Sequence, residues 1–265
     1  MHAFEYHKPA STKDALALGK KDEARYLAGG QSLVQAMKLR LSSPSDLIDL
    51  SSIKELTGIK ASSSGVEIGA MTRHADVAGS KEVQKAIPAL AALAGIIGDR
   101  QVRHMGTIGG SLANSDPAAD YPAAVLALGA TITTSKRKIE ADKFFKGLYE
   151  TALEPGELIT SVAFPAPKRA AYMKFKNPAS RFAIVGVFVA DFGGGKVRVA
   201  VTGAGPCAFR QADMEKALSA KFSPDALAGI KVKPDGLNND LHASPEYRAH
   251  LITVMAKRAV EAALK

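Results

Sequence analysis

Short apolar runs, broken by glycine, proline and polar residues, open the chain and predict a small α/β unit. Strands are expected near residues 4–6, 25–28 and 47–50, and helices over residues 11–19 and 33–41. Ser11 and Ser32 stand at the two helix starts, where a hydroxyl commonly caps the first turn. This alternation indicates a unit covering residues 1–55.

From Ile53 onward the pattern changes to strands joined by short turns, with alanine-rich segments between them. The predicted strands cover residues 58–61, 65–70, 130–134 and 158–164. The predicted helices cover residues 88–97 and 122–128, with a short one that Thr72 caps and that begins near His74. We therefore expect residues 56–167 to form a mainly antiparallel sheet with helices on its flank. Pro165-Ala166-Pro167 marks the domain boundary.

The remaining residues, 168–265, predict a second α+β domain with an antiparallel sheet and helices. Gly193-Gly194-Gly195 separates two β-rich runs and is typical of a hairpin. The elements expected here are strands over 172–176, 182–192 and 196–201 and helices over 212–220, 224–229 and 245–264. The apolar face of the last helix is interpreted as core.

Two glycine-rich stretches have too little side-chain bulk to be explained by packing. The longer one runs from Gly106 to Asp120, and the shorter one, Ala28 to Leu33, lies between a strand and a helix. Glycine allows backbone to lie against a ligand, and free N–H groups beside a helix start attract phosphate. Two such stretches together predict a ligand with two phosphates, although glycine-rich turns are more often plain connections.

The two stretches resemble the FAD motifs of a known family. Ala28-Gly29-Gly30-Gln31-Ser32, with Met37-Lys38-Leu39-Arg40 and Leu47-Ile48-Asp49-Leu50, resembles the first FAD motif of the medium subunit of molybdenum hydroxylases, the carbon monoxide dehydrogenase and xanthine dehydrogenase class. Thr107-Ile108-Gly109-Gly110-Ser111, with Asp116-Pro117-Ala118-Ala119-Asp120, is similar to the second motif. The likeness extends over nearly the whole chain. The C-terminal domain is accordingly expected to be of the carbon monoxide dehydrogenase flavoprotein type.

The resemblance implies that FAD lies extended between the two N-terminal units, with its diphosphate between the glycine stretches. Asp120 would accept hydrogen bonds from ribityl hydroxyls or cap the following helix, and Lys176 would lie near the flavin ring or at a solvated strand edge. The cofactor-binding residues so implied are Ala28, Gly29, Gly30, Gln31, Ser32, Leu33, Ile97, Thr107, Ile108, Gly109, Gly110, Ser111, Asn114, Asp120, Leu158, Ile159 and Lys176. Two departures from the family pattern, His104 and Arg181, concern the flavin surroundings.

The same resemblance implies an electron relay without catalytic residues in this chain. A large molybdopterin subunit would oxidise the substrate, and a small subunit with two [2Fe–2S] clusters would pass electrons to FAD and on to an external acceptor, in a dimer of heterotrimers. The single cysteine, Cys207, agrees with clusters on another polypeptide, because a cluster normally takes about four thiolates. Substrate and acceptor stay open.

Composition narrows the alternatives. The chain has 265 residues, 46% hydrophobic and 23% charged, with no signal-peptide core and no apolar run able to span a membrane, so a cytoplasmic protein is expected. The formal charge of +9 is spread along the chain, with one compact run at Lys136-Arg137-Lys138. A stand-alone flavin oxidase or dehydrogenase is one rival interpretation, and a basic module that binds nucleic-acid phosphates is another. No bound metal is predicted.

A third glycine segment is a misleading match. Gly203-Ala204-Gly205-Pro206-Cys207-Ala208 follows a predicted strand and fits the dinucleotide pattern G-x-G-x-x-A. Pro206 lacks an N–H donor, and no β-α-β unit follows, so we interpret the segment as a structural turn.

Overall fold

The computed structural model describes residues 1–265 and begins with a small parallel sheet. Its strands lie in the order β1 (Glu5–His7), β3 (Asp46–Asp49), β2 (Arg25–Leu27). Around them are α1 (Thr12–Leu18), α2 (Leu33–Lys38) and the 3-10 turns η1 (Leu50–Ser52) and η2 (Lys54–Leu56). Ile48, Ala15 and Leu56 belong to a separate small core, so this unit has its own interior.

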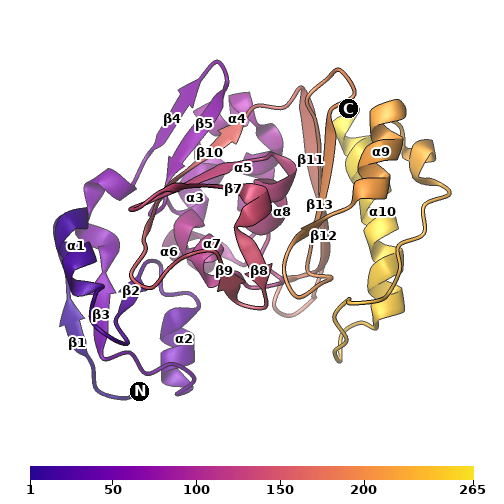
Figure 1. Ribbon diagram of the computed structural model, residues 1–265. Helices are drawn as coiled ribbons and strands as arrows, with labels where there is room; N and C mark the ends of the chain where they lie inside the picture. The colour runs from indigo at the N-terminus through magenta and orange to yellow at the C-terminus, as the bar shows by residue number, and fades with distance from the viewer.

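A five-stranded antiparallel sheet follows, as the sequence predicts. Its order is β4 (Ile59–Ser62), β5 (Gly65–Gly69), β10 (Ile159–Pro165), β6 (Thr131–Thr134), β7 (Lys138–Glu140). The turn η3 (Ala141–Lys143) follows β7, and β8 (Phe145–Gly147) and β9 (Glu150–Thr151) then form a separate two-stranded sheet. In Figure 1 this sheet lies between the N-terminal unit and the C-terminal part.

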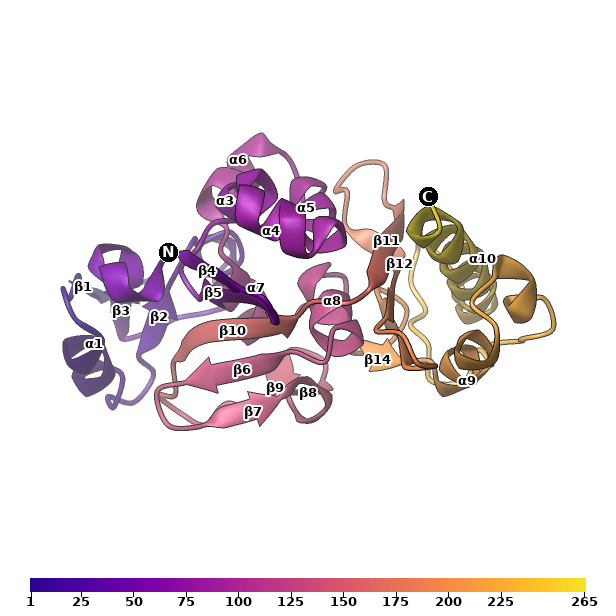
Figure 2. The ribbon, with the colours of Figure 1, turned by 90° about the horizontal axis from the view of Figure 1, so that it is seen from above.

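Six helices accompany this sheet, more than the three that the sequence predicts. They are α3 (His74–Gly79), α4 (Lys81–Ala86), α5 (Pro88–Gly95), α6 (Arg100–Met105), α7 (Ile108–Asn114) and α8 (Tyr121–Ala127). Figure 2 shows α3 to α6 gathered on one side, while α8 lies toward the C-terminal part. Helices of six residues hold fewer than two turns, too short for a periodic apolar pattern to be evident.

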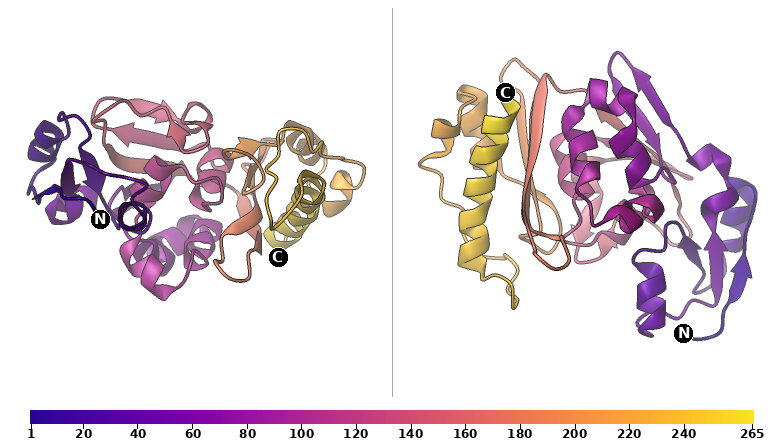
Figure 3. Two further views of the ribbon diagram at one scale, coloured as in Figure 1. Left: turned by 90° about the horizontal axis from the view of Figure 1, so that it is seen from below. Right: turned by 180° about the vertical axis from the view of Figure 1, so that it is seen from behind.

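The C-terminal part is a four-stranded antiparallel sheet covered by helices. Its order is β11 (Arg169–Lys176), β12 (Ala183–Asp191), β13 (Val197–Thr202), β14 (Phe209–Arg210). The helix α9 (Ala212–Ala220), the turn η4 (Pro224–Leu227) and α10 (Pro245–Ala263) follow. Figure 3 shows α9 and α10 on one face of this sheet. The predicted Gly193–Gly195 turn has positive φ at all three glycines.

Alternation along β12 explains how this sheet joins the rest. Val187 and Val189 pack into a core with α9 and α10, whereas Phe188 and Ala190 belong to the large core beneath the middle sheet. The helix α8 packs against β12 and β13. The interior is therefore continuous across residue 167, and the predicted domain division there stays a prediction.

Three expectations about local structure are wrong in detail. The helix predicted over residues 33–41 ends at Lys38, because Arg40 adopts a positive φ of 61°. The Ser32 side chain makes no cap hydrogen bond, and neither does Asp120 at the start of α8.

None of the helices is long and apolar enough to cross a membrane.

Candidate functional site

A cavity of about 500 Å³ lies where three parts of the chain meet. Ala28 to Leu33 line it from the N-terminal unit, and Gly106, Thr107, Gly110 and Ser111 line it from the second glycine stretch. The loop Ser180–Phe182 between β11 and β12 contributes from the C-terminal part. The structure thus brings together two segments that are about eighty positions apart in the sequence.

Glycine allows the two stretches to touch at this point. A Cβ on Gly29 would lie 2.0 Å from the carbonyl oxygen of Met105 and 2.6 Å from Cα of Gly106. A Cβ on Gly110 would lie 3.3 Å from Cβ of Ala28. Any side chain at position 29 would therefore push the second stretch away from the first.

The shorter stretch presents unused backbone donors. No hydrogen bond within the chain uses the N–H groups of Gly29, Gly30, Gln31 or Ser32. Gly30 adopts a φ of +70°, which places this turn in the region that favours glycine. Consecutive free N–H groups at a cavity wall can bind an anion, as the sequence predicts.

The longer stretch differs from the expected row of free donors. Ile108 N–H donates to the carbonyl of Thr72, Gly109 N–H to that of Ala70, and Gly110 N–H to Oγ1 of Thr107. A Cβ on Gly109 would lie 2.5 Å from Cβ of Ala70. Packing therefore does explain part of this stretch, contrary to expectation, because its glycines let α7 lie directly against residues 70–72.

A buried polar network borders the cavity at Asp120. Its side chain is only 4% exposed; it accepts a hydrogen bond from Oη of Tyr172 at 2.5 Å and pairs with Nζ of Lys174 at 3.0 Å. Burial raises the pKa of Asp120, while Lys174 and Tyr172 oppose that rise. An ion pair so enclosed is an unusual feature beside a cavity, and it fixes Asp120 between β11 and α8.

Lys174, and not Lys176, is the lysine that the fold brings to this border. Both stand on β11, but the pairing with β12 shifts between Phe175 and Lys176, and Lys176 is exposed. The side chain of Lys174 is only 3% exposed. Tyr172 and Lys174 are two positions apart, which places them on one strand face.

Five of the predicted residues lie outside the cavity lining. Ile108 and Gly109 are buried behind it, Leu158 is buried in the small core of the N-terminal unit, Ile159 is buried in β10, and Lys176 is exposed. Leu158 uses both backbone groups with Ser135, whose Oγ accepts from Leu158 N–H at 3.1 Å. Cofactor contacts for these five stay predictions. The other twelve line the cavity: Ala28, Gly29, Gly30, Gln31, Ser32, Leu33, Ile97, Thr107, Gly110, Ser111, Asn114 and Asp120.

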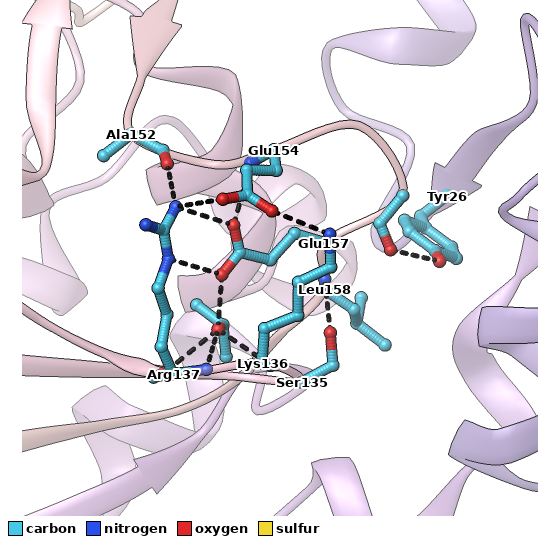
Figure 4. A network of polar contacts seen from close by, with 10 residues as sticks. Tyr26, Ser135, Lys136, Arg137, Ala152, Glu154, Glu157 and Leu158 are labelled. Atoms are coloured by element: carbon cyan, nitrogen blue, oxygen red, sulfur yellow. Dashed lines mark hydrogen bonds and ion pairs between the residues drawn. The ribbon is translucent and has the colours of Figure 1, made fainter.

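An ion-pair network holds the loop before β10 against the β6–β7 hairpin, and one hydrogen bond joins that loop to the N-terminal unit (Figure 4). Glu157, whose side chain is fully buried, accepts from Nε and Nη2 of Arg137 at 3.2 and 3.1 Å. Lys136 pairs with Glu154 at 2.8 Å. Oη of Tyr26, a cavity residue, donates to the carbonyl of Gly156 at 3.0 Å. In the basic run Lys136-Arg137-Lys138, Lys136 and Arg137 are thus paired with acidic side chains.

Several lining residues were not predicted from the sequence. Tyr149 and Phe182 are large apolar residues that line the cavity and are 59% and 49% exposed to solvent. Arg181, which the resemblance already placed in the flavin surroundings, also lines the cavity; it has a positive φ of 62° and donates to the carbonyl of Gly98 at 3.4 Å. His74 also lines the cavity, although it is 5% exposed. His104, by contrast, is exposed and lies outside the lining.

Comparisons with known proteins give one consistent result. Residues 2–167 match the family described as "FAD binding domain in molybdopterin dehydrogenase". The carbon monoxide dehydrogenase medium chain of Afipia carboxidovorans is 36% identical, covering 98% of this chain and 96% of that one. The glyceraldehyde dehydrogenase medium chain of Sulfolobus acidocaldarius is 35% identical, with coverage of 97% and 96%. The structure of reconstituted carbon monoxide dehydrogenase from Oligotropha carboxidovorans matches with a TM-score of 0.90 at 35% identity, covering 99% of this chain and 98% of that one.

Proposed function

The chain belongs to the FAD-binding family of the molybdopterin dehydrogenases, and from this premise we propose its place in an electron-transfer chain. It acts as the flavin-carrying medium subunit of a molybdenum hydroxylase, which receives electrons from [2Fe–2S] clusters of a partner and passes them to an external acceptor. The predicted family, the α+β fold class, the oxidoreductase class and the FAD cofactor are confirmed.

One observation carries the proposal: two glycine stretches close upon one cavity that has unused N–H donors on its wall. The cavity volume of about 500 Å³ lies within the range usual for ligand sites, about 300–1,000 Å³. A Cβ at Gly29 would collide with the facing backbone, so the close spacing of the two stretches depends on glycine at this position. These residues fit a dinucleotide with a diphosphate.

The residues of this chain would bind and orient the cofactor and tune its surroundings. Gly29 to Ser32 would hold the diphosphate, and Asp120 the ribityl hydroxyls. Lys174, held within hydrogen-bond distance of Asp120, is a second candidate beside Lys176 for the fixed cation near the flavin that the resemblance implies. Bound FAD supplies a carrier that accepts electrons singly or in pairs, and its potential responds to such charges and hydrogen bonds.

The proposed organisation has residues 1–167 as the FAD-binding domain, built from residues 1–55 and 56–167, and residues 168–265 as a C-terminal domain. The loop Ser180–Phe182 reaches the cavity from the second domain, which supports a role for that domain in closing the site. A large molybdopterin subunit and a small iron–sulfur subunit complete the complex, as a dimer of heterotrimers. The "medium chain" names of the relatives support this assignment.

Purification from its own host tests the proposal. A tagged copy should retain FAD, molybdenum and iron in a fixed ratio through native size-exclusion chromatography, measured by visible absorption and elemental analysis. The isolated chain should hold FAD without oxidising small substrates. Recovery of a flavin-loaded chain that is free of molybdenum and iron, and that oxidises a small substrate alone, would instead establish the stand-alone oxidase. A flavin-free protein that binds DNA would establish the basic module.

A further inference from the structure

A buried histidine at the junction of the glycine stretches has no role in the function proposed above. His74 begins α3, lines the cavity and is 5% exposed. Its Nδ1 is buried and lacks a hydrogen-bond partner, although a buried polar atom normally has one. Its backbone N–H donates to the carbonyl of Gly106 at 2.9 Å, which anchors the ring beside the second stretch.

The position of the ring is set by Gly106. A Cβ on Gly106 would lie 2.6 Å from Nε2 of His74, so the imidazole lies directly against the start of the second stretch. Gly106 in turn lies against Gly29. His74 is therefore one residue removed from the free N–H groups of the first stretch. Because Ile108 to Gly110 use their own N–H groups within the chain, this side of the cavity has few backbone donors left.

We propose that His74 binds the diphosphate of FAD by donating a hydrogen bond from Nε2 to a phosphate oxygen at the junction of Gly29 and Gly106. This inference rests on the proposed function and adds a side-chain donor to that site. It gives the second stretch a donor opposite the N–H groups of Gly29 to Ser32.

The neighbours of the ring favour the proton on Nε2. The ring of Tyr121 on α8 lies 5.3 Å away, centroid to centroid, and its buried hydroxyl also lacks a partner. Since no group bonds Nδ1, and a buried N–H without a partner is rarer than an under-satisfied acceptor, Nδ1 is the unprotonated nitrogen and the proton lies on Nε2. Burial and Arg103 on α6 lower the pKa of His74 to about 4, so the donor is neutral at physiological pH. Asp120, next to Tyr121, is already engaged by Tyr172 and Lys174.

Two substitutions separate this role from mere packing. In His74→Gln the amide nitrogen can reach the place of Nε2, whereas in His74→Asn it reaches only that of Nδ1. Both remove the ring. Calorimetric titration of the apo-protein with FAD, and with ADP as a diphosphate probe without flavin, should give a roughly 10- to 100-fold weaker Kd for His74→Asn, the range expected for one hydrogen bond to a charged group. For His74→Gln the Kd should stay within about threefold of that of the parent protein.

The outcomes are distinct. Equal Kd values for all three proteins, equal losses in both variants, or a loss with FAD but none with ADP would overturn the inference while leaving the flavin role intact. A parent protein that binds no FAD would overturn the proposed function and the inference with it. Nitrogen NMR of the imidazole in the unmutated protein needs no variant to fold: ADP should shift the protonated Nε2 resonance. A proton on Nδ1, or no shift, would refute the assignment.

Discussion

Replacement of Gly29 by alanine isolates the close approach of the two glycine stretches. The added Cβ would lie 2.0 Å from the carbonyl oxygen of Met105, and contacts below 3.0 Å essentially never occur, so the stretches must separate by about 1 Å. In the free protein they can move apart because Gly29 lies on a loop. Binding a diphosphate between them requires the closed spacing, so the strain of closing appears in the affinity.

The magnitude follows from the strain of an overpacked contact. Such contacts cost about 1–3 kcal/mol, which corresponds to a roughly 5- to 150-fold weaker Kd for FAD. Gly79→Ala is the matched control: Gly79 ends α3, a Cβ there would have no atom within 4 Å, and its FAD affinity should be unchanged. Titration of each apo-protein with FAD, followed by flavin fluorescence, measures both, and thermal unfolding checks that both chains fold.

Parental FAD affinity in a folded Gly29→Ala protein would refute this reasoning. The choice of position 29 matters. Gly109 was the obvious target in the sequence, but its Cβ would collide with Ala70 within the core, so a loss of FAD there would report unfolding as much as binding.

Three further predictions concern buried titratable groups. Lys174→Met leaves the carboxylate of Asp120 buried without its cation and should lower the free energy of unfolding by about 3–5 kcal/mol in urea; adding Asp120→Asn should recover part of that loss, and no recovery would contradict the pairing. The pKa of His74 is lowered to about 4 from 6.5, so the unfolded chain binds the proton of this ring more tightly than the folded chain does. The free energy of unfolding that neutral His74 contributes is complete above pH 6.5 and is lost as the pH falls through 4, a change of at most about 3 kcal/mol. His74→Gln should abolish this change in unfolding curves measured from pH 4 to 7. Glu157→Gln weakens the charged bonds from Arg137 and should lower stability by about 1–3 kcal/mol, read as a fall in Tm; an unchanged Tm would show that the network adds nothing.

Much of the fold could be predicted from hydrophobic periodicity and from the glycine and proline residues at turns. The hairpin around Gly193-Gly194-Gly195 and the long helix Pro245–Ala263 fall within a residue or two of the expected places, because turn glycines and a full apolar face are local signals. Short helices such as α6 and α7 were not predicted, since six or seven residues rich in glycine or charge give no periodic face.

The candidate site could likewise be predicted only where its signals are local in the sequence. The convergence of Ala28–Leu33 with Gly106–Ser111 could be predicted because glycine-rich backbone is its own signal. The places of Lys174 and His74 could not be predicted, because they depend on contacts across the fold. The strand register shifts after Phe175, which separates Lys174 from the exposed Lys176, and His74 lies beside Gly106. The engagement of Gly109 N–H by Ala70 likewise depends on a strand far away in the sequence.

Amide hydrogen exchange of the whole protein, with and without FAD, tests the central claim most directly. The N–H groups of Gly29 to Ser32 have no partner in the chain, so they should exchange fast in the apo-protein and slow markedly once FAD binds. Those of Ile108 to Gly110 should be protected in both states. If FAD slows amide exchange elsewhere in the chain but not at Gly29 to Ser32, the account is contradicted.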